Sequence, residues 1–240
     1  MKYSERPYYL QTSVSRLGRT GCSMQTNELR LCIGLAAMLH DYGKALPKYQ
    51  MQFHDNCVLD SKKSHPSFYL HELFSAIIAL RVCKGLGLSN PCTFLVSFPV
   101  LQHLHSMRSV GNVLTHRNLP HLMDGFDITD LALSKYSDEL RLIFDEISSL
   151  MELGVNSSAK QTWFHDIRKE EPKELLDYFM GMSSRKGERW LRLYVLVLNP
   201  VVIGDNLDSG EHRLTEENQN RRAFTLELKT AIGENTDWNI

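Results

Sequence analysis

The sequence predicts an all-α protein, and three observations indicate it. Long apolar segments such as LRLCIGLAAML and SFYLHELFSAIIALRVC have the length and spacing of helices. Capping residues or prolines stand before several of these segments, and glycines follow them. Paired strand segments joined by hairpin turn residues are absent from the sequence. We therefore expect a bundle of helices.

The first three expected helices carry the most distinctive polar residues. A helix over 26–41 begins with a Thr-Asn-Glu cap and is apolar on nearly every face, so we expect it to be central and buried. A helix over 66–87 has a proline in its first turn and ends at one of two glycines. A helix over 90–109 begins at an Asn-Pro pair and is kinked or reset at Pro99.

The second half of the chain is expected to hold a loop and four further helices. Within the late apolar segment, LYVLVL is ambiguous between strand and helix by its period, but the segment's length and flanks favour a helix. The expected loop covers 111–126, and the expected helices cover 137–154, 172–182, 188–205 and 216–232.

Composition indicates an ordinary globular protein. Its 240 residues are 42% hydrophobic and 23% charged, and we expect a single domain over 1–240, with a polar segment at 1–25 and a C-terminal helix and tail at 211–240. No apolar run approaches a membrane span, and the N-terminus lacks the apolar core of a signal peptide. Five cysteines without a CxxC pair suggest reduced thiols. We expect a cytoplasmic protein with no membrane partner.

The net charge of −1 bears on nucleic-acid binding. Sequence-independent binding depends on neutralising several phosphates, and the chain has no overall basic excess for this. A protein of this charge that acts on nucleic acid is expected to hold it weakly and to rely on a partner.

Five polar residues stand at or near helix ends in apolar surroundings. Imidazoles and carboxylates are ligands for divalent metals, and their burial costs several kcal/mol unless they are paired or coordinated. Any one of them fits a structural role, but together they fit convergence inside a helical bundle. They are His40, Asp41, His71, His103 and Asp205. The sequence therefore predicts a metal site between central helices.

The residues after the His-Asp pair support a phosphate-handling site. Gly43 permits a close turn, and Lys44 places a cation where a phosphate would sit. A lysine in this place can stabilise the charge that develops on a phosphate. We expect Asp41 and Lys44 to be the catalytic residues, and the site to be that of a phosphodiester hydrolase.

The order of these motifs resembles the HD superfamily of metal-dependent phosphohydrolases. Within it, LHDYGKALPKYQ is similar to a "LHDxGKAxxxFQ" stretch of the CRISPR-associated HD nuclease, which acts in type I CRISPR interference. YLHELFSA, VLQHLHSMR and VVIGDNLDS are similar to that family's later motifs. The resemblance spans roughly residues 29–210 and includes no helicase motif. It therefore points to the stand-alone nuclease subunit.

The resemblance implies a cofactor, a substrate and partners. It implies a divalent ion (Mn, Ni, Co, Fe or Mg) and cleavage of single-stranded DNA in antiviral defence, with a separate helicase subunit and a CRISPR effector complex as partners. His105 and Arg108 would be additional metal or phosphate contacts, while Glu72 and Asp208 would orient ligands.

Two departures from the family pattern favour one metal site over two. No histidine precedes His40, and Leu104 separates His103 from His105 where the family often has adjacent histidines. Two other functions stay open: a phosphohydrolase of nucleotides or cyclic nucleotides, and a docking module with too few ligands to hold metal.

Overall fold

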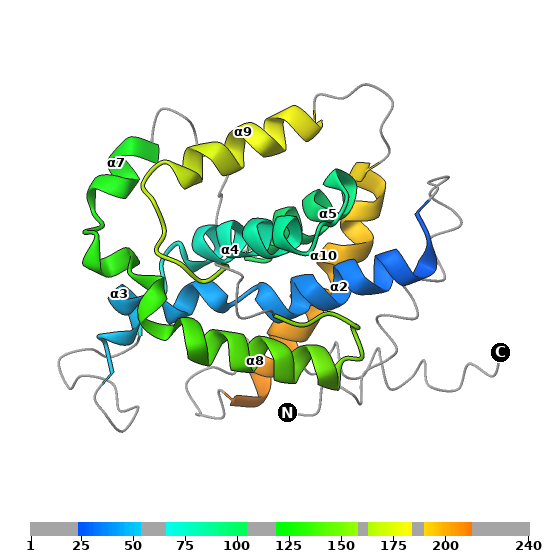
Figure 1. Cartoon of the computed structure of the whole chain (residues 1–240), viewed down its shortest axis with the longest axis horizontal. Coiled ribbons are helices and arrows are strands. Elements are labelled where there is room, and N and C mark those ends of the chain that lie inside the picture. The colour runs from blue at the N-terminus through cyan, green and yellow to red at the C-terminus, as the bar shows by residue number, and fades with distance from the viewer. Residues whose placement is uncertain (1–23, 54–65, 105–118, 158–162, 184–189, 213–240) are drawn as a thin grey trace. The chain divides into compact units, whose positions relative to one another are not determined.

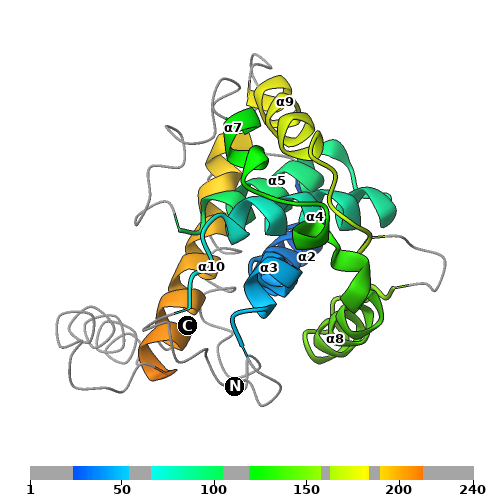
Figure 2. The same ribbon diagram turned by 90° about the vertical axis from the view of Figure 1, so that its left-hand side faces the viewer.

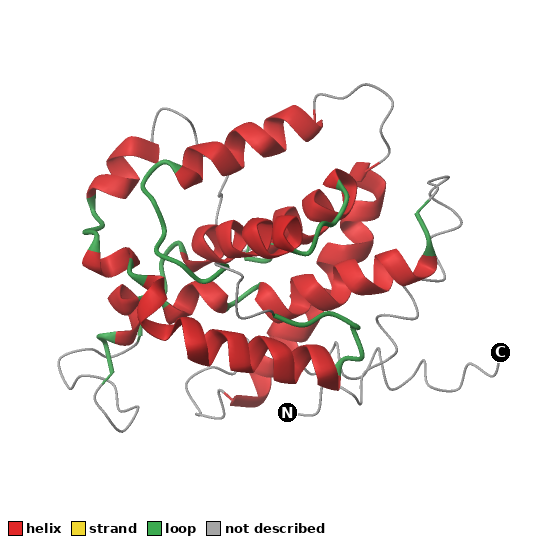
Figure 3. Cartoon of the chain, viewed as in Figure 1, coloured by secondary structure: helices red, strands yellow, loops and turns green. Residues whose placement is uncertain are grey.

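The computed structural model of the chain describes residues 24–53, 66–104, 119–157, 163–183 and 190–212 (Figure 1). Within these ranges the regular elements are helices and no strand is present, which confirms the predicted all-α class (Figure 3). The chain divides into two compact units, Met1–Val201 and Val202–Ile240. Among the described helices, none is long and apolar enough to cross a membrane.

Three helices form the centre of the first unit. They are α2 (Thr26–Leu39), α4 (His71–Gly85) and α5 (Asn90–Gln102), and each contacts the other two. All three are apolar on most faces, and their largest core side chains are fully buried, as at Phe74 and Phe94. Helices that are apolar all round require cover on every side, so the remaining elements pack around them.

The surrounding elements cover this centre. The 3₁₀ turn η3 (Tyr42–Ala45) follows α2 and packs on α4, while α9 (Glu171–Ser183) covers α4 and α5. Helix α8 (Ser137–Leu150) lies beside α2 (Figure 2). The other elements are α3 (Pro47–Gln50), α7 (Leu119–Asp124), η4 (Thr129–Leu131), η5 (Leu133–Tyr136) and α10 (Trp190–His212).

Most of the expected helices are confirmed. Helix α2 has its predicted start, α5 begins at Asn90 with Ser89 accepting a hydrogen bond from the Cys92 backbone N–H (3.4 Å), and α8 begins at Ser137. The late apolar segment is the helix α10. The helix expected over 216–232 lies outside the described residues.

Three expectations are wrong. Helix α4 begins at His71 and not at Pro66, because Leu70 has a left-handed backbone (φ +68°) that a continuous helix does not allow. The six-residue helix α7 lies inside the stretch expected to be a loop. Asp205 lies within α10, which continues to His212, and so does not end the helix.

A buried ion pair joins α4 to α9. Arg81 donates through Nε to Glu171 Oε1 (2.8 Å) and through Nη2 to Glu171 Oε2 (2.5 Å), and both side chains are about nine-tenths buried. The same guanidinium donates to the backbone carbonyls of His165 (2.7 Å) and Asp166 (2.9 Å). Its donors therefore hold both α9 and the segment that precedes it.

We predict that Arg81→Met lowers the free energy of unfolding by about 3–5 kcal/mol, because it leaves the Glu171 carboxylate buried without its cation. Urea unfolding measures the change. Glu174→Ala is the matched control, because Glu174 and Arg168 form an exposed pair that is worth at most about 1 kcal/mol. Equal effects of the two substitutions would contradict the prediction.

Candidate metal centre

Three histidines stand at the ends of the three central helices, and each of them makes the same kind of hydrogen bond. His40 follows α2, His71 begins α4 and His103 follows α5. In each ring Nδ1 lies within hydrogen-bond distance of the carbonyl oxygen three residues earlier, at 2.7 Å from Ala37, 2.7 Å from Phe68 and 2.6 Å from Val100.

The hydrogen bond to the carbonyl decides which nitrogen of each ring can bind a metal. A carbonyl oxygen only accepts, so Nδ1 must carry the proton and donate it. In a neutral imidazole of that tautomer the lone pair is on Nε2. Carbonyls that orient ligand histidines in this way are typical of metal sites in proteins. All three rings are therefore prepared to bind a metal through Nε2.

Asp41 brings these rings to one centre. Its Oδ1 lies 3.1 Å from His71 Nε2, and its Oδ2 lies 3.5 Å from His40 Nε2. One potential ligand atom from each of Asp41, His71 and His103 lies within 4.8 Å of the others. The His103 ring packs edge-on against both other rings, with centroids 5.2 Å from His40 and 5.4 Å from His71.

A close backbone approach places Asp41 beside α4. The Gly43 backbone N–H donates to Ser75 Oγ (2.8 Å), which ties η3 to α4. A Cβ at Gly43 would lie 2.2 Å from the His71 carbonyl oxygen and 2.7 Å from the Ser75 backbone nitrogen. Any larger residue would have to push η3 away from α4, so glycine is required for the carboxylate to reach His71.

The ionisation of the site suits metal binding. Burial raises the pKa of the Asp41 carboxyl, but contact with His71 and the charges of His40 and Lys44 outweigh it and hold the pKa well below its usual range. Burial and the neighbouring His40 lower the pKa of His103 to about 3. At neutral pH the site therefore combines a carboxylate with a neutral imidazole, the forms that ligate metals.

The donor set fits a divalent transition ion. His103 is only 2% exposed, and its Nε2 is buried with no hydrogen-bond partner, although burying a polar atom unsatisfied is costly. A metal ion would satisfy this nitrogen. Imidazole and carboxylate ligands suit Mn²⁺, Fe²⁺, Co²⁺ and Ni²⁺, and carboxylates also suit Mg²⁺.

Lys44 lies at the edge of the cluster. Its Nζ donates to Asp41 Oδ2 (2.6 Å) and lies 5.4 Å from the centre of the Phe68 ring. The Lys44 side chain is about one-third exposed, so its ammonium is accessible from solvent beside the buried imidazoles. The predicted cation therefore does stand next to the His-Asp pair.

Some of the predicted site residues stay predictions. Asp205 belongs to the second unit, so its role as a ligand stays a prediction. His105 and Arg108 lie outside the described residues. Glu72 is fully buried with Oε2 3.4 Å from His71 Nδ1, but the closer acceptor of that nitrogen is the Phe68 carbonyl. The sequence analysis missed the three orienting carbonyls, since a backbone oxygen has no sequence signal.

An all-α bundle with an adjacent His-Asp pair and further histidines at helix ends resembles the HD-type metal-dependent phosphohydrolases. The chain is 28% identical over 223 residues to the curated "CRISPR-associated endonuclease Cas3-HD" of Saccharolobus solfataricus, a match that covers 92% of this chain and 84% of the relative. No family model matches the chain. The similarity to the relative confirms the resemblance to CRISPR-associated HD nucleases and supports a metal-dependent nuclease.

We predict that His71→Ala and His103→Ala each weaken Mn²⁺ binding by at least about 10- to 100-fold, because loss of a direct ligand should cost no less than loss of an orienting partner. Calorimetric titration and elemental analysis of the folded variants measure the change. His121→Ala is the control, since that side chain is 85% exposed on α7. Full metal content in a folded His71→Ala, His103→Ala double variant would rule out this centre.

Proposed function

We propose that the chain is a metal-dependent nuclease that hydrolyses phosphodiester bonds of single-stranded DNA. The observation that carries the proposal is the set of three histidines at helix ends whose Nδ1 atoms are bound to carbonyls, with ligand atoms of His71, His103 and Asp41 gathered within 4.8 Å of one another. The CRISPR endonuclease similar over nearly the whole chain supports a polymeric nucleic acid as the substrate.

His40, Asp41, His71 and His103 would hold the ion, with one site rather than two. Asp205 would be a further ligand, as the resemblance of VVIGDNLDS to the last motif of the CRISPR-associated HD nucleases implies. A divalent ion in such a site lowers the pKa of a bound water and neutralises charge on the phosphate. The residues of the chain would supply the ligand atoms, and the three backbone carbonyls would orient the imidazole rings.

Lys44 would contact the substrate phosphate. Its ammonium already lies against a carboxylate oxygen, at the distance expected of a charge-assisted hydrogen bond. A non-bridging phosphate oxygen is an acceptor of the same kind, and the partial exposure of the side chain lets substrate approach it. Asp41 would then align the site while Lys44 stabilises the charge that develops on phosphorus.

A partner would deliver the strand. The net charge of −1 gives the chain little attraction for phosphates, so we expect weak substrate binding by the isolated protein. A helicase subunit and a CRISPR effector complex in the cytoplasm, where such a defence would act, are the partners that the similarity favours. A helicase would also supply the unwound strand.

We predict that the purified protein cleaves a labelled DNA single strand in the presence of Mn²⁺ or Ni²⁺ and that EDTA abolishes cleavage. Denaturing gels resolve the products, and a duplex of the same sequence serves as the comparison substrate. If the protein hydrolyses nucleotides or cyclic nucleotides while leaving the polymer intact, it is a small-molecule phosphohydrolase instead.

For Lys44→Ala we predict a turnover that falls by about tenfold to a thousandfold, as for loss of an electrostatic donor to the transition state. Metal content should stay near wild type, because His71, His103 and Asp41 are retained. Lys84→Ala is the control, since Lys84 is an exposed lysine on α4 that lies over the Tyr178 ring. Wild-type cleavage by Lys44→Ala would remove Lys44 from the site.

A further inference from the structure

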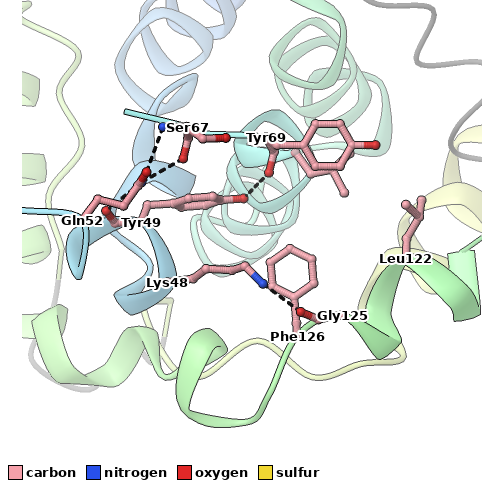
Figure 4. Close-up of a pocket in the computed structure, with 9 residues that line it drawn as sticks. Lys48, Tyr49, Gln52, Ser67, Tyr69, Leu122, Gly125 and Phe126 are labelled. Atoms are coloured by element: carbon pink, nitrogen blue, oxygen red, sulfur yellow. Dashed lines mark hydrogen bonds between the residues drawn. The ribbon is translucent and has the colours of Figure 1, made fainter. Parts of the chain in front are cut away.

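An open pocket lies on the first unit beside the start of α4 (Figure 4). Its volume is about 330 Å³, near the lower end of the range for small-molecule pockets, which is about 300–1,000 Å³. Tyr69, Leu122 and Phe126 give the lining its apolar and aromatic side chains. Lys48 also lines the pocket and lies below Tyr49 in Figure 4. Tyr69 is 46% exposed, although it is a large aromatic side chain.

The only charged side chain of the lining is already neutralised. Lys48 Nζ donates to the Gly125 carbonyl (2.7 Å), lies 3.6 Å from Asp130 Oδ2 and stands 4.0 Å from the centre of the Phe126 ring. A phosphate entering the pocket would therefore compete with three existing contacts of this ammonium. The pocket is better suited to a flat apolar or aromatic group than to an anion.

Two polar side chains of the lining, Gln52 and Tyr49, are also hydrogen-bonded within the protein. Gln52 accepts from the Ser67 backbone N–H (2.8 Å) and donates to the carbonyls of Ser67 (2.8 Å) and Tyr49 (3.0 Å). The Tyr49 hydroxyl donates to the Tyr69 carbonyl (2.5 Å), as Figure 4 shows. These groups stiffen the pocket, but they are already used and cannot read the edge of a base.

The backbone connects this pocket directly to the metal centre. Tyr69 and Leu70 line the pocket, and the next residue is the ligand candidate His71. Two residues span at most about 7 Å of chain. On the preceding side, Phe68 gives its carbonyl to the His71 ring. The left-handed backbone of Leu70 reverses the chain here, so that Tyr69 is exposed while Leu70 is buried.

We propose that this pocket binds an unpaired nucleobase of the substrate strand, stacked on the Tyr69 ring, next to the phosphate that is cleaved. The inference rests on the proposed nuclease function and names its base-binding subsite. Base–aromatic stacking tolerates every base because each has a π face. Because Gln52 and Tyr49 are already hydrogen-bonded within the protein, we expect the pocket to bind a base without sequence preference. The subsite would set which phosphate of the strand lies at the metal centre.

The test measures binding apart from cleavage. Tyr69→Ala and Tyr69→Trp are compared with wild type for binding a fluorescent single-stranded oligonucleotide by anisotropy in EDTA. We expect Tyr69→Ala to bind about 5- to 150-fold more weakly, which is the range for loss of one stacked base, and Tyr69→Trp to bind at least as well as wild type. Met51→Ala is the control, because Met51 is 75% exposed, follows α3 directly and does not line the pocket.

Two further probes decide what the pocket binds. A strand of the same length that is abasic throughout should bind wild type and Tyr69→Ala equally. Unchanged oligonucleotide binding by Tyr69→Ala would overturn the subsite. If a deoxynucleoside monophosphate competes as strongly as the unlabelled oligonucleotide, the pocket binds a free nucleotide, and the proposal that it binds a base of a strand is overturned.

Cleavage by the same preparations in Mn²⁺ reports on the proposed function separately. Cleavage by wild type together with unchanged binding by Tyr69→Ala would reject the subsite and keep the nuclease. Weakened binding by Tyr69→Ala without any cleavage by wild type would keep a base-binding subsite and reject the nuclease.

Discussion

The hydrogen bond between a histidine Nδ1 and the carbonyl three residues earlier is the interaction on which the rest of the site depends. It occurs three times, at the ends of the three central helices. Carbonyls in the last turn of a helix lack an intrahelical partner. After α2 and α5 such carbonyls accept from His40 and His103, so the helix end and the metal ligand satisfy each other. The packing of α2, α4 and α5 thereby sets the positions of the imidazoles.

At the start of α4, His71 makes the same hydrogen bond to a carbonyl, but the backbone before it is different. Here the helix follows a left-handed Leu70, an unusual conformation for a branched residue that proteins retain mainly where function requires it. The strained residue separates two surfaces within four residues, with Phe68 and His71 at the metal centre and Tyr69 in the neighbouring pocket. A regular helix from Pro66 would not divide these side chains in this way.

An identity of 28% to the curated relative leaves most positions of the two chains different. The physical demands of the centre explain this pattern. The ligands must be histidine or aspartate, Gly43 must lack a Cβ, and the helices must be apolar on most faces. Elsewhere, many combinations of apolar residues fill a core of the same volume. The candidate metal centre therefore constrains the residue type at only a few positions of the chain.

The sequence alone determined the all-α class, the places of α2, α5 and α8, and the candidate ligands His40, Asp41, His71 and His103, because helical periodicity, capping residues and buried polar residues have local signals. The start of α4 and the short α7 required the structure, since Leu70 and the residues around Pro120 have no sequence pattern that reveals their backbone. Only the tertiary structure decided which ring nitrogen of each histidine is bound to a carbonyl, how closely η3 approaches α4, and that Tyr69 lines a pocket beside His71. Those features arise from contacts between residues far apart in the chain or from backbone carbonyls. The local sequence of side chains predicts neither kind of contact.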